Sequence, residues 1–191
     1  MTTLHLAGDP AADELLARDP FALLVGMLLD QQFPMERAFA GPALIAQRLG
    51  TTDLDPAAIA AHDPEAFTAL MTGPPAVHRF PGSMGERVQK VAAFVVDTYD
   101  GDASALWNTA TTGAELLKRV KALPGFGDQK ARILVALLGK QLGVQPEGWR
   151  EAAGGYGEEG STRSVADVVD AESLGKVRAF KKAKKAAAAS Q

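Results

Sequence analysis

Apolar positions along the chain recur with helical spacing. Residues 20–32, PFALLVGMLLDQQ, open with a proline and continue as an apolar run, as expected of a helix buried on most sides. Residues 35–50, MERAFAGPALIAQRLG, show apolar spacing near 3.6 and end at a glycine. Residues 55–62 and 63–72 each begin Asp-Pro, an N-cap followed by proline at the first helical position. The pattern predicts a helix for each of these segments.

The second half of the chain continues the pattern. After a loop rich in proline and glycine, the spacing predicts helices over 84–99, 112–123 and 128–143. Residues 144–163 are rich in glycine and predict an ordered loop, either a lid or a spacer, before a last helical region at 164–185. No alternation of period two is sustained. We therefore expect an all-α fold of eight or nine short helices, arranged as one domain or two small lobes.

The amino-acid composition excludes several kinds of site and of partner. The 191 residues include no cysteine, which excludes disulfides, thiolate nucleophiles and cysteine-held zinc or iron–sulfur clusters. No signal peptide or membrane-spanning run is present in the sequence, so we expect a soluble, cytoplasmic protein that does not bind membranes. The formal net charge of −3 argues against a partner, such as nonspecifically bound nucleic acid, that is attracted by a broad positively charged surface.

The C-terminus departs from this acidic balance. Residues 176–185, KVRAFKKAKK, are basic and form either a solvated tail or an arm that reaches phosphates. We predict one helical domain over 1–180 and a basic, disordered tail over 181–191.

The most informative stretch is LPGFGDQKA, residues 123–131, between two predicted helices. Gly125 and Gly127 can adopt backbone angles that other residues disfavour. Because they have no side chains, they also let the backbone of another molecule come close. The amides that begin the second helix then form an anion site suited to a nucleic-acid phosphate. Basic residues cluster around the turn, whereas the Asp128 carboxylate would repel a phosphate. The alternative is that the turn is only a tight corner between two helices.

The segment LPGFGDQKARILVALLGK resembles the hairpin of the helix-hairpin-helix (HhH-GPD) DNA glycosylases, the superfamily of endonuclease III and the adenine and alkyladenine glycosylases. MLLDQQFPMERAF (27–39) is similar to the family's early helix, whose glutamines enter the duplex, and GSMGERVQKVAAF (82–94) to the helix before the hairpin. These motifs cover roughly residues 20–147 in the family's order. The resemblance implies two helical lobes with the hairpin at 114–140.

It also implies base excision repair of double-stranded DNA that contains a lesion or mismatch. The base is flipped out and its bond to deoxyribose is hydrolysed. The motif assigns DNA contacts to Gly125, Phe126, Gly127, Gln129 and Lys130 at the hairpin, with Gln31 and Gln32 as the wedge. We expect a monomer that has no cofactor, since the lack of cysteine excludes an iron–sulfur cluster and the three histidines show no zinc-ligand spacing. The hairpin has room for a monovalent cation.

The family's catalytic aspartate lies about twenty residues after the second hairpin glycine, where this chain has Glu147. Glu151 and Asp167 are the other carboxylate candidates. Bifunctional members carry a lysine nucleophile where this chain has Gln129, so we expect a monofunctional enzyme without lyase activity.

Other interpretations stay open at this point. The departure from aspartate at Glu147 also fits a protein of the same fold that recognises damaged DNA without cleaving it. A third interpretation is a helical protein that binds other proteins, in which the turn is only a corner between two helices. The aromatic and histidine candidates for a base pocket are Trp149, Tyr156, Phe80, His78 and Trp107.

Overall fold

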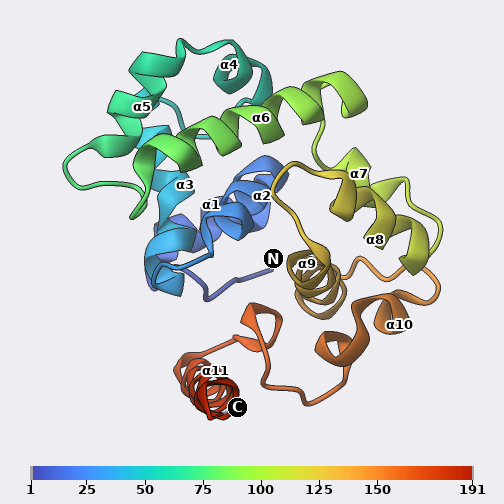
Figure 1. The fold of residues 1–191 in the computed structure, drawn as a ribbon. Helices are drawn as coiled ribbons and strands as arrows, with labels where there is room; N and C mark the ends of the chain where they lie inside the picture. Colours follow the sequence, from blue (N-terminus) through green and yellow to red (C-terminus); the bar gives the residue numbers. More distant parts are fainter. Residues whose placement is uncertain (1, 191) are drawn as a thin grey trace. The chain divides into compact units, whose positions relative to one another are not determined.

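The computed structural model describes residues 2–190, and 67% of it is helical (Figure 1). No strand is present among these residues, which contain a single isolated bridge between Thr112 and Glu147. The all-α prediction is therefore confirmed.

The chain divides into two compact units. The first contains residues 3–109 and 122–126, and the second contains residues 110–121 and 127–190 together with Thr2. The division falls within the hairpin. Residues 122–126 of the turn thus belong to the first unit, whereas Gly127 and most of the two flanking helices belong to the second.

The first unit holds seven helices among its described residues: α1 (Pro10–Arg18), α2 (Pro20–Leu29), α3 (Met35–Leu49), α4 (Pro56–Ala61), α5 (Pro64–Thr72), α6 (Pro81–Tyr99) and α7 (Ala105–Asn108). Four of them begin Asp-Pro, and each of these aspartates accepts a hydrogen bond from a backbone N–H of its own first turn. The helices predicted in this unit lie within about three residues of the observed ones. The short helices α1 and α7 were not predicted.

Helix α2 forms the centre of this unit, since every residue from Phe21 to Leu29 is buried. It packs closely on α3 through two glycines. A Cβ on Gly26 would lie 2.8 Å from Cδ1 of Phe39, and a Cβ on Gly41 would lie 2.6 Å from Cδ1 of Leu29. The absence of side chains at both positions lets the two helices approach each other.

The second unit contains α8 (Gly113–Ala122, whose last residue lies in the first unit), α9 (Asp128–Gln141), α10 (Trp149–Ala153), the 3₁₀ turns η1 (Gly154–Gly157) and η2 (Val165–Asp167), and α11 (Ala171–Ala189). Helix α9 is its buried centre, with all residues from Leu134 to Gly139 withdrawn from solvent.

The loop predicted at 144–163 contains α10 and η1, which both pack against α9. The indole of Trp149 lies on α9 at Gly139, where a Cβ would be 2.3 Å from Cε3 of the ring. The loop is therefore a folded part of this unit.

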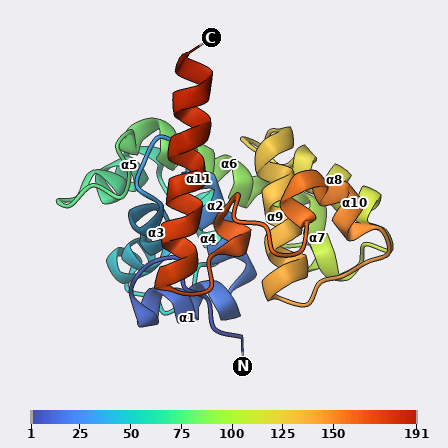
Figure 2. The same ribbon diagram turned by 90° about the horizontal axis from the view of Figure 1, so that it is seen from below.

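The tail predicted to be disordered from residue 181 is helical as far as Ala189, because α11 runs through it without a break (Figure 2). Alanine and lysine both have high helix propensity, which accounts for the continuation. Residue 191 lies outside the described residues.

Candidate nucleic-acid interface

The turn between α8 and α9 is held by a buried aromatic ring and a left-handed glycine. Gly125 has φ +82°, and a Cβ there would lie 2.9 Å from Cδ1 of Leu28 on α2. The N–H of Phe126 donates to the carbonyl of Leu123 at 3.1 Å. The Phe126 side chain is 5% exposed. We had expected Phe126 to contact DNA, but its ring belongs to the core and its amide is already used inside the turn.

Gly127 is the N-cap of α9, and it is open to its surroundings. Its backbone is extended (φ −78°, ψ 179°), and no side chain caps the helix at this position. No atom lies within 4 Å of the place where its Cβ would be. The start of a 14-residue helix, with its positive dipole end, is thus approachable by another molecule's backbone at Gly127.

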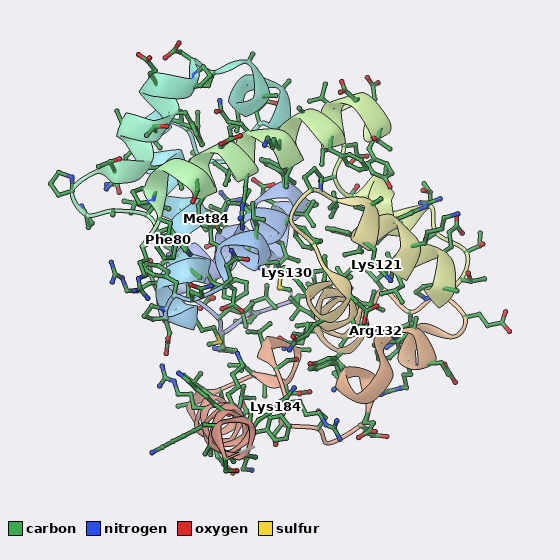
Figure 3. The ribbon with its side chains drawn as sticks, in the orientation of Figure 1. Phe80, Met84, Lys121, Lys130, Arg132 and Lys184 are labelled. Atoms are coloured by element: carbon green, nitrogen blue, oxygen red, sulfur yellow. The ribbon has the colours of Figure 1, made fainter. Side chains whose placement is uncertain are left out.

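The Asp128 carboxylate at this helix start is paired with cations. Its Oδ1 lies 3.1 Å from Nζ of Lys121 on α8, and its Oδ2 accepts from Nε of Arg132 at 2.9 Å. Figure 3 shows Lys121 and Arg132 beside α8 and α9. The hydrogen bonds from Arg132 and Lys121 lower the pKa of Asp128. The carboxylate that would repel a phosphate therefore stands between two compensating positive charges.

Gln129 is engaged by the 3₁₀ turn η1. Its Nε2 donates to the hydroxyl of Tyr156 at 3.0 Å. One turn of α9 further on, Nη1 of Arg132 donates to the carbonyl of Ala152 at 2.7 Å. The region around α10 and η1 thus lies against the start of α9. Lys130, labelled in Figure 3, is half-buried on the same helix.

Gln31 and Gln32 lie in the loop between α2 and α3. Gln31 is half-buried, with Nε2 3.9 Å from Sδ of Met84, and Gln32 is exposed with φ +51°, the left-handed conformation. Gln31 lies three residues after Leu28, which contacts Gly125. Within the first unit, the two glutamines therefore follow the helix that contacts Gly125.

A buried histidine fixes this loop, and the sequence did not reveal it. Nε2 of His78 lies 3.0 Å from the carbonyl of Leu29 and 3.1 Å from that of Gln31, while Nδ1 accepts the N–H of Phe80. Because Nε2 faces two acceptors and Nδ1 faces a donor, the ring is the Nε2–H tautomer. The His78 residue is only 1% exposed, and the two carbonyl groups that its Nε2 faces lie 47 and 49 residues earlier in the sequence.

The segment that His78 holds carries an exposed aromatic ring. Phe80 is 43% exposed at the start of α6, and the guanidinium of Arg79 lies 5.2 Å from its ring centroid. Arg37 similarly lies over Phe33, whose ring is 4.6 Å from His78. Phe80 thus stays available as an aromatic contact. The two tryptophans named as pocket candidates are both largely buried.

Glu147 lies at the other end of α9 from the hairpin. Its side chain is exposed, and its carbonyl accepts the N–H of Gly113 at 2.7 Å. Its neighbours Gln145 and Trp149 both contact Gly139, eleven residues after Asp128, which is about 16 Å along the helix. A carboxylate that stabilises a sugar cation needs a site shielded from water, and Glu147 does not occupy one.

The other two carboxylates differ from each other. Glu151 is exposed on α10. The side chain of Asp167 is 4% exposed, and its Oδ1 lies 2.6 Å from Nζ of Lys140. Its Oδ2 accepts from the hydroxyl of Ser161 and the backbone N–H of Arg163 at 2.9 Å each. Lys140 is twelve residues, or about 18 Å, along α9 from Asp128.

Residues 2–190 contain no group of three or more histidine, aspartate or glutamate side chains placed to hold a metal ion. Over the same residues, no helix combines the length and the apolar character needed to cross a bilayer. In comparisons with protein-family models, curated proteins and solved structures, nothing matches the chain.

Proposed function

We propose that this chain is a DNA-binding protein of the helix-hairpin-helix glycosylase type, which grips the phosphate backbone at the turn 123–130 and acts in base excision repair as a monofunctional N-glycosylase. The observation that carries the proposal is the open backbone at Gly127, with no atom within 4 Å of its missing Cβ and no side chain capping α9. Backbone amides at such a helix start bind phosphate without sequence preference.

The position of the wedge residues supports the proposal. Gly125 contacts Leu28 on α2, and Gln31 and Gln32 follow that helix directly. A protein that extrudes a base fills the vacated space in the duplex with a side chain. The exposed, left-handed Gln32 is the residue suited to this task.

Gln129 supports monofunctional chemistry. An amide cannot form a Schiff base with the sugar, and this one is bonded to Tyr156. Hydrolysis by a monofunctional enzyme adds water across the glycosidic bond, so that the base leaves with a proton and an abasic site remains.

A second candidate function, recognition of damaged DNA without cleavage, is favoured by the carboxylates. Glu147 and Glu151 are exposed, and Asp167 is already bonded to Lys140 and to the turn around Ser161. Of the three, Asp167 is the one whose burial suits the stabilisation of a sugar cation.

The binding half of the proposal is tested with Gly127→Ala. Alanine can adopt the native backbone angles and meets no atom, so the fold is unchanged, but the methyl group stands where a phosphate would approach. We expect clearly weaker binding to a labelled duplex. Gly82→Ala, a helical glycine of α6 whose Cβ would lie 3.9 Å from Cγ2 of Thr68, an ordinary contact distance, is the matched control. Equal affinity of the two variants would contradict the proposal.

The catalytic half is tested with duplexes that carry uracil, alkylated purines, 8-oxoguanine or hypoxanthine, followed by alkali. Strand scission only after alkali indicates a monofunctional glycosylase. Glu147→Gln and Asp167→Asn are compared in the same assay, and loss of scission in one of them, with the fold retained, identifies the carboxylate. Lesion binding without scission across the panel identifies the recognition protein instead.

A further inference from the structure

The second half of α11 is a helix with almost nothing packed on it. Val177 is the one buried residue of α11. Phe180 is half-buried, and its ring centroid lies 5.9 Å from the guanidinium of Arg163. Every residue from 181 to 190 is exposed. Lys184, labelled in Figure 3, lies on this segment. The fold therefore extends α11 well beyond the residues that anchor it.

The exposed segment has one cationic face. At 100° per residue, five basic side chains fall within an arc of about 160°, and the alanines of the segment lie mostly on the opposite side. These basic residues are Arg178, Lys181, Lys182, Lys184 and Lys185. A helix that is polar on one side and lined with alanine on the other has no face suited to a protein core.

The charges repel one another along the helix. Lys181 lies three residues from Lys184 and four from Lys185, and like charges at these spacings destabilise a helix. Glu172 pairs with Lys176 at 2.8 Å, and no acidic residue follows Glu172 in the chain. A bound polyanion would remove this repulsion.

We propose that residues 178–185 of α11 are a second contact with the DNA phosphate backbone, separate from the hairpin. The formal net charge of the chain is −3, and it would be −9 without the six cations of residues 176–185. The protein thus concentrates positive charge on this one exposed helix, which is complementary to the regular negative charge of a duplex.

The side opposite the lysines distinguishes DNA from a membrane surface. A helix that lies in a lipid interface needs large apolar side chains on the face away from its cations. Here that face consists of small residues such as Ala179, Ala183 and Ala186. The helix thus has the charge to bind phosphates but not the apolar surface to enter lipid.

The inference rests on the proposed function for the identity of the partner, whereas the contact itself is independent of the hairpin. It is tested in the full chain with the fourfold variant Lys181→Gln, Lys182→Gln, Lys184→Gln, Lys185→Gln. The matched control replaces the same four lysines with arginine. Glutamine and arginine are good helix formers, and all four positions are exposed, so the fold is preserved.

Affinity for an undamaged labelled duplex is measured over a range of salt concentrations. Each phosphate contact contributes about 0.9 to the slope of log K against log salt, so the glutamine variant is expected to lose about 3 to 4 from the slope and to bind less tightly at low salt. The arginine variant keeps the wild-type slope. Addition of DNA also increases the helical circular dichroism signal of the wild type more than that of the glutamine variant.

The outcomes separate the two proposals. An unchanged slope in the glutamine variant overturns the second contact, and the hairpin proposal stands if Gly127→Ala still weakens binding. If Gly127→Ala binds like the wild type while the glutamine variant shows the reduced slope of log K against log salt, the hairpin proposal fails and the helix contact stands. Binding to vesicles that contain phosphatidylserine, without binding to the duplex, overturns both.

Discussion

Nζ of Lys140 lies 2.6 Å from Oδ1 of Asp167, and the two side chains are 13% and 4% exposed. The pair joins α9 to the turn η2, 27 residues later in the chain. The other carboxylate oxygen accepts the backbone N–H groups of Arg163 and Ser164 and thereby closes the turn. Asp167 therefore organises the chain between α10 and α11.

The first prediction follows from this pair. Asp167→Ala leaves a largely buried ammonium group and two backbone N–H groups without their acceptor, and we expect a loss of about 3–5 kcal/mol in the free energy of unfolding. Urea denaturation measures it. Lys90→Ala, which removes an exposed ion pair with Glu86, should change stability little. A stability of Asp167→Ala equal to wild type would show that the pair has no structural role.

Two glycine-to-alanine changes in helices should have opposite effects. At Gly139 the new methyl group would overlap the indole of Trp149, with Cβ 2.3 Å from Cε3, and overpacking of this kind costs about 1–3 kcal/mol. At Gly175 the methyl group meets nothing, and alanine stabilises an exposed helix by up to about 1 kcal/mol. Thermal denaturation of both variants checks the signs, and destabilisation by Gly175→Ala would contradict the helical assignment there.

Removal of the negative charge at the hairpin should strengthen DNA binding. Asp128→Asn frees Lys121 and Arg132 from their shared partner and removes the one carboxylate beside Gly127 in the turn. We expect tighter binding of a duplex at low salt, with a gain that fades as salt increases. Asp97→Asn, the same charge change on an exposed site of α6, is the control. A similar gain in both variants would mean that only net charge matters.

The stability of the first unit should depend on pH through Asp19. This buried N-cap accepts the N–H groups of Phe21, Ala22 and Leu54, yet burial raises its pKa above the ordinary value of 3.8. The folded state therefore holds the proton more tightly than the unfolded state. The stability contribution of this group is complete below about pH 3.8 and is lost as pH rises through the folded pKa.

Asp19→Asn has no such titration. The free energy of unfolding of the wild type, relative to that of the variant, should therefore decrease as pH rises above about 4. Urea denaturation of both proteins at several pH values measures this trend. A difference that grows with pH would mean that the hydrogen bonds to the carboxylate, and not its burial, dominate its pKa.

Local pattern was sufficient for most of the helices. The Asp-Pro starts at α2, α4 and α5 and the glycine end of α3 are properties of adjacent residues, and they lie within about a residue of the prediction. The left-handed conformation of Gly125 and the open surroundings of Gly127 are likewise consistent with the two glycines that the sequence places in this turn. The helix α10 was missed because its five residues carry too short a pattern.

The sequence by itself determined the all-α class, the main helices and the hairpin turn, because periodicity, caps and glycines act within a few residues. Only the tertiary structure decided the environment of each candidate side chain. Counting from Gly127 led to Glu147, yet packing of Trp149 on Gly139 leaves that residue exposed at the far end of α9. His78 and Asp167 are buried by partners far away in the chain, and no local pattern records such contacts, since burial is set by what the rest of the fold brings alongside.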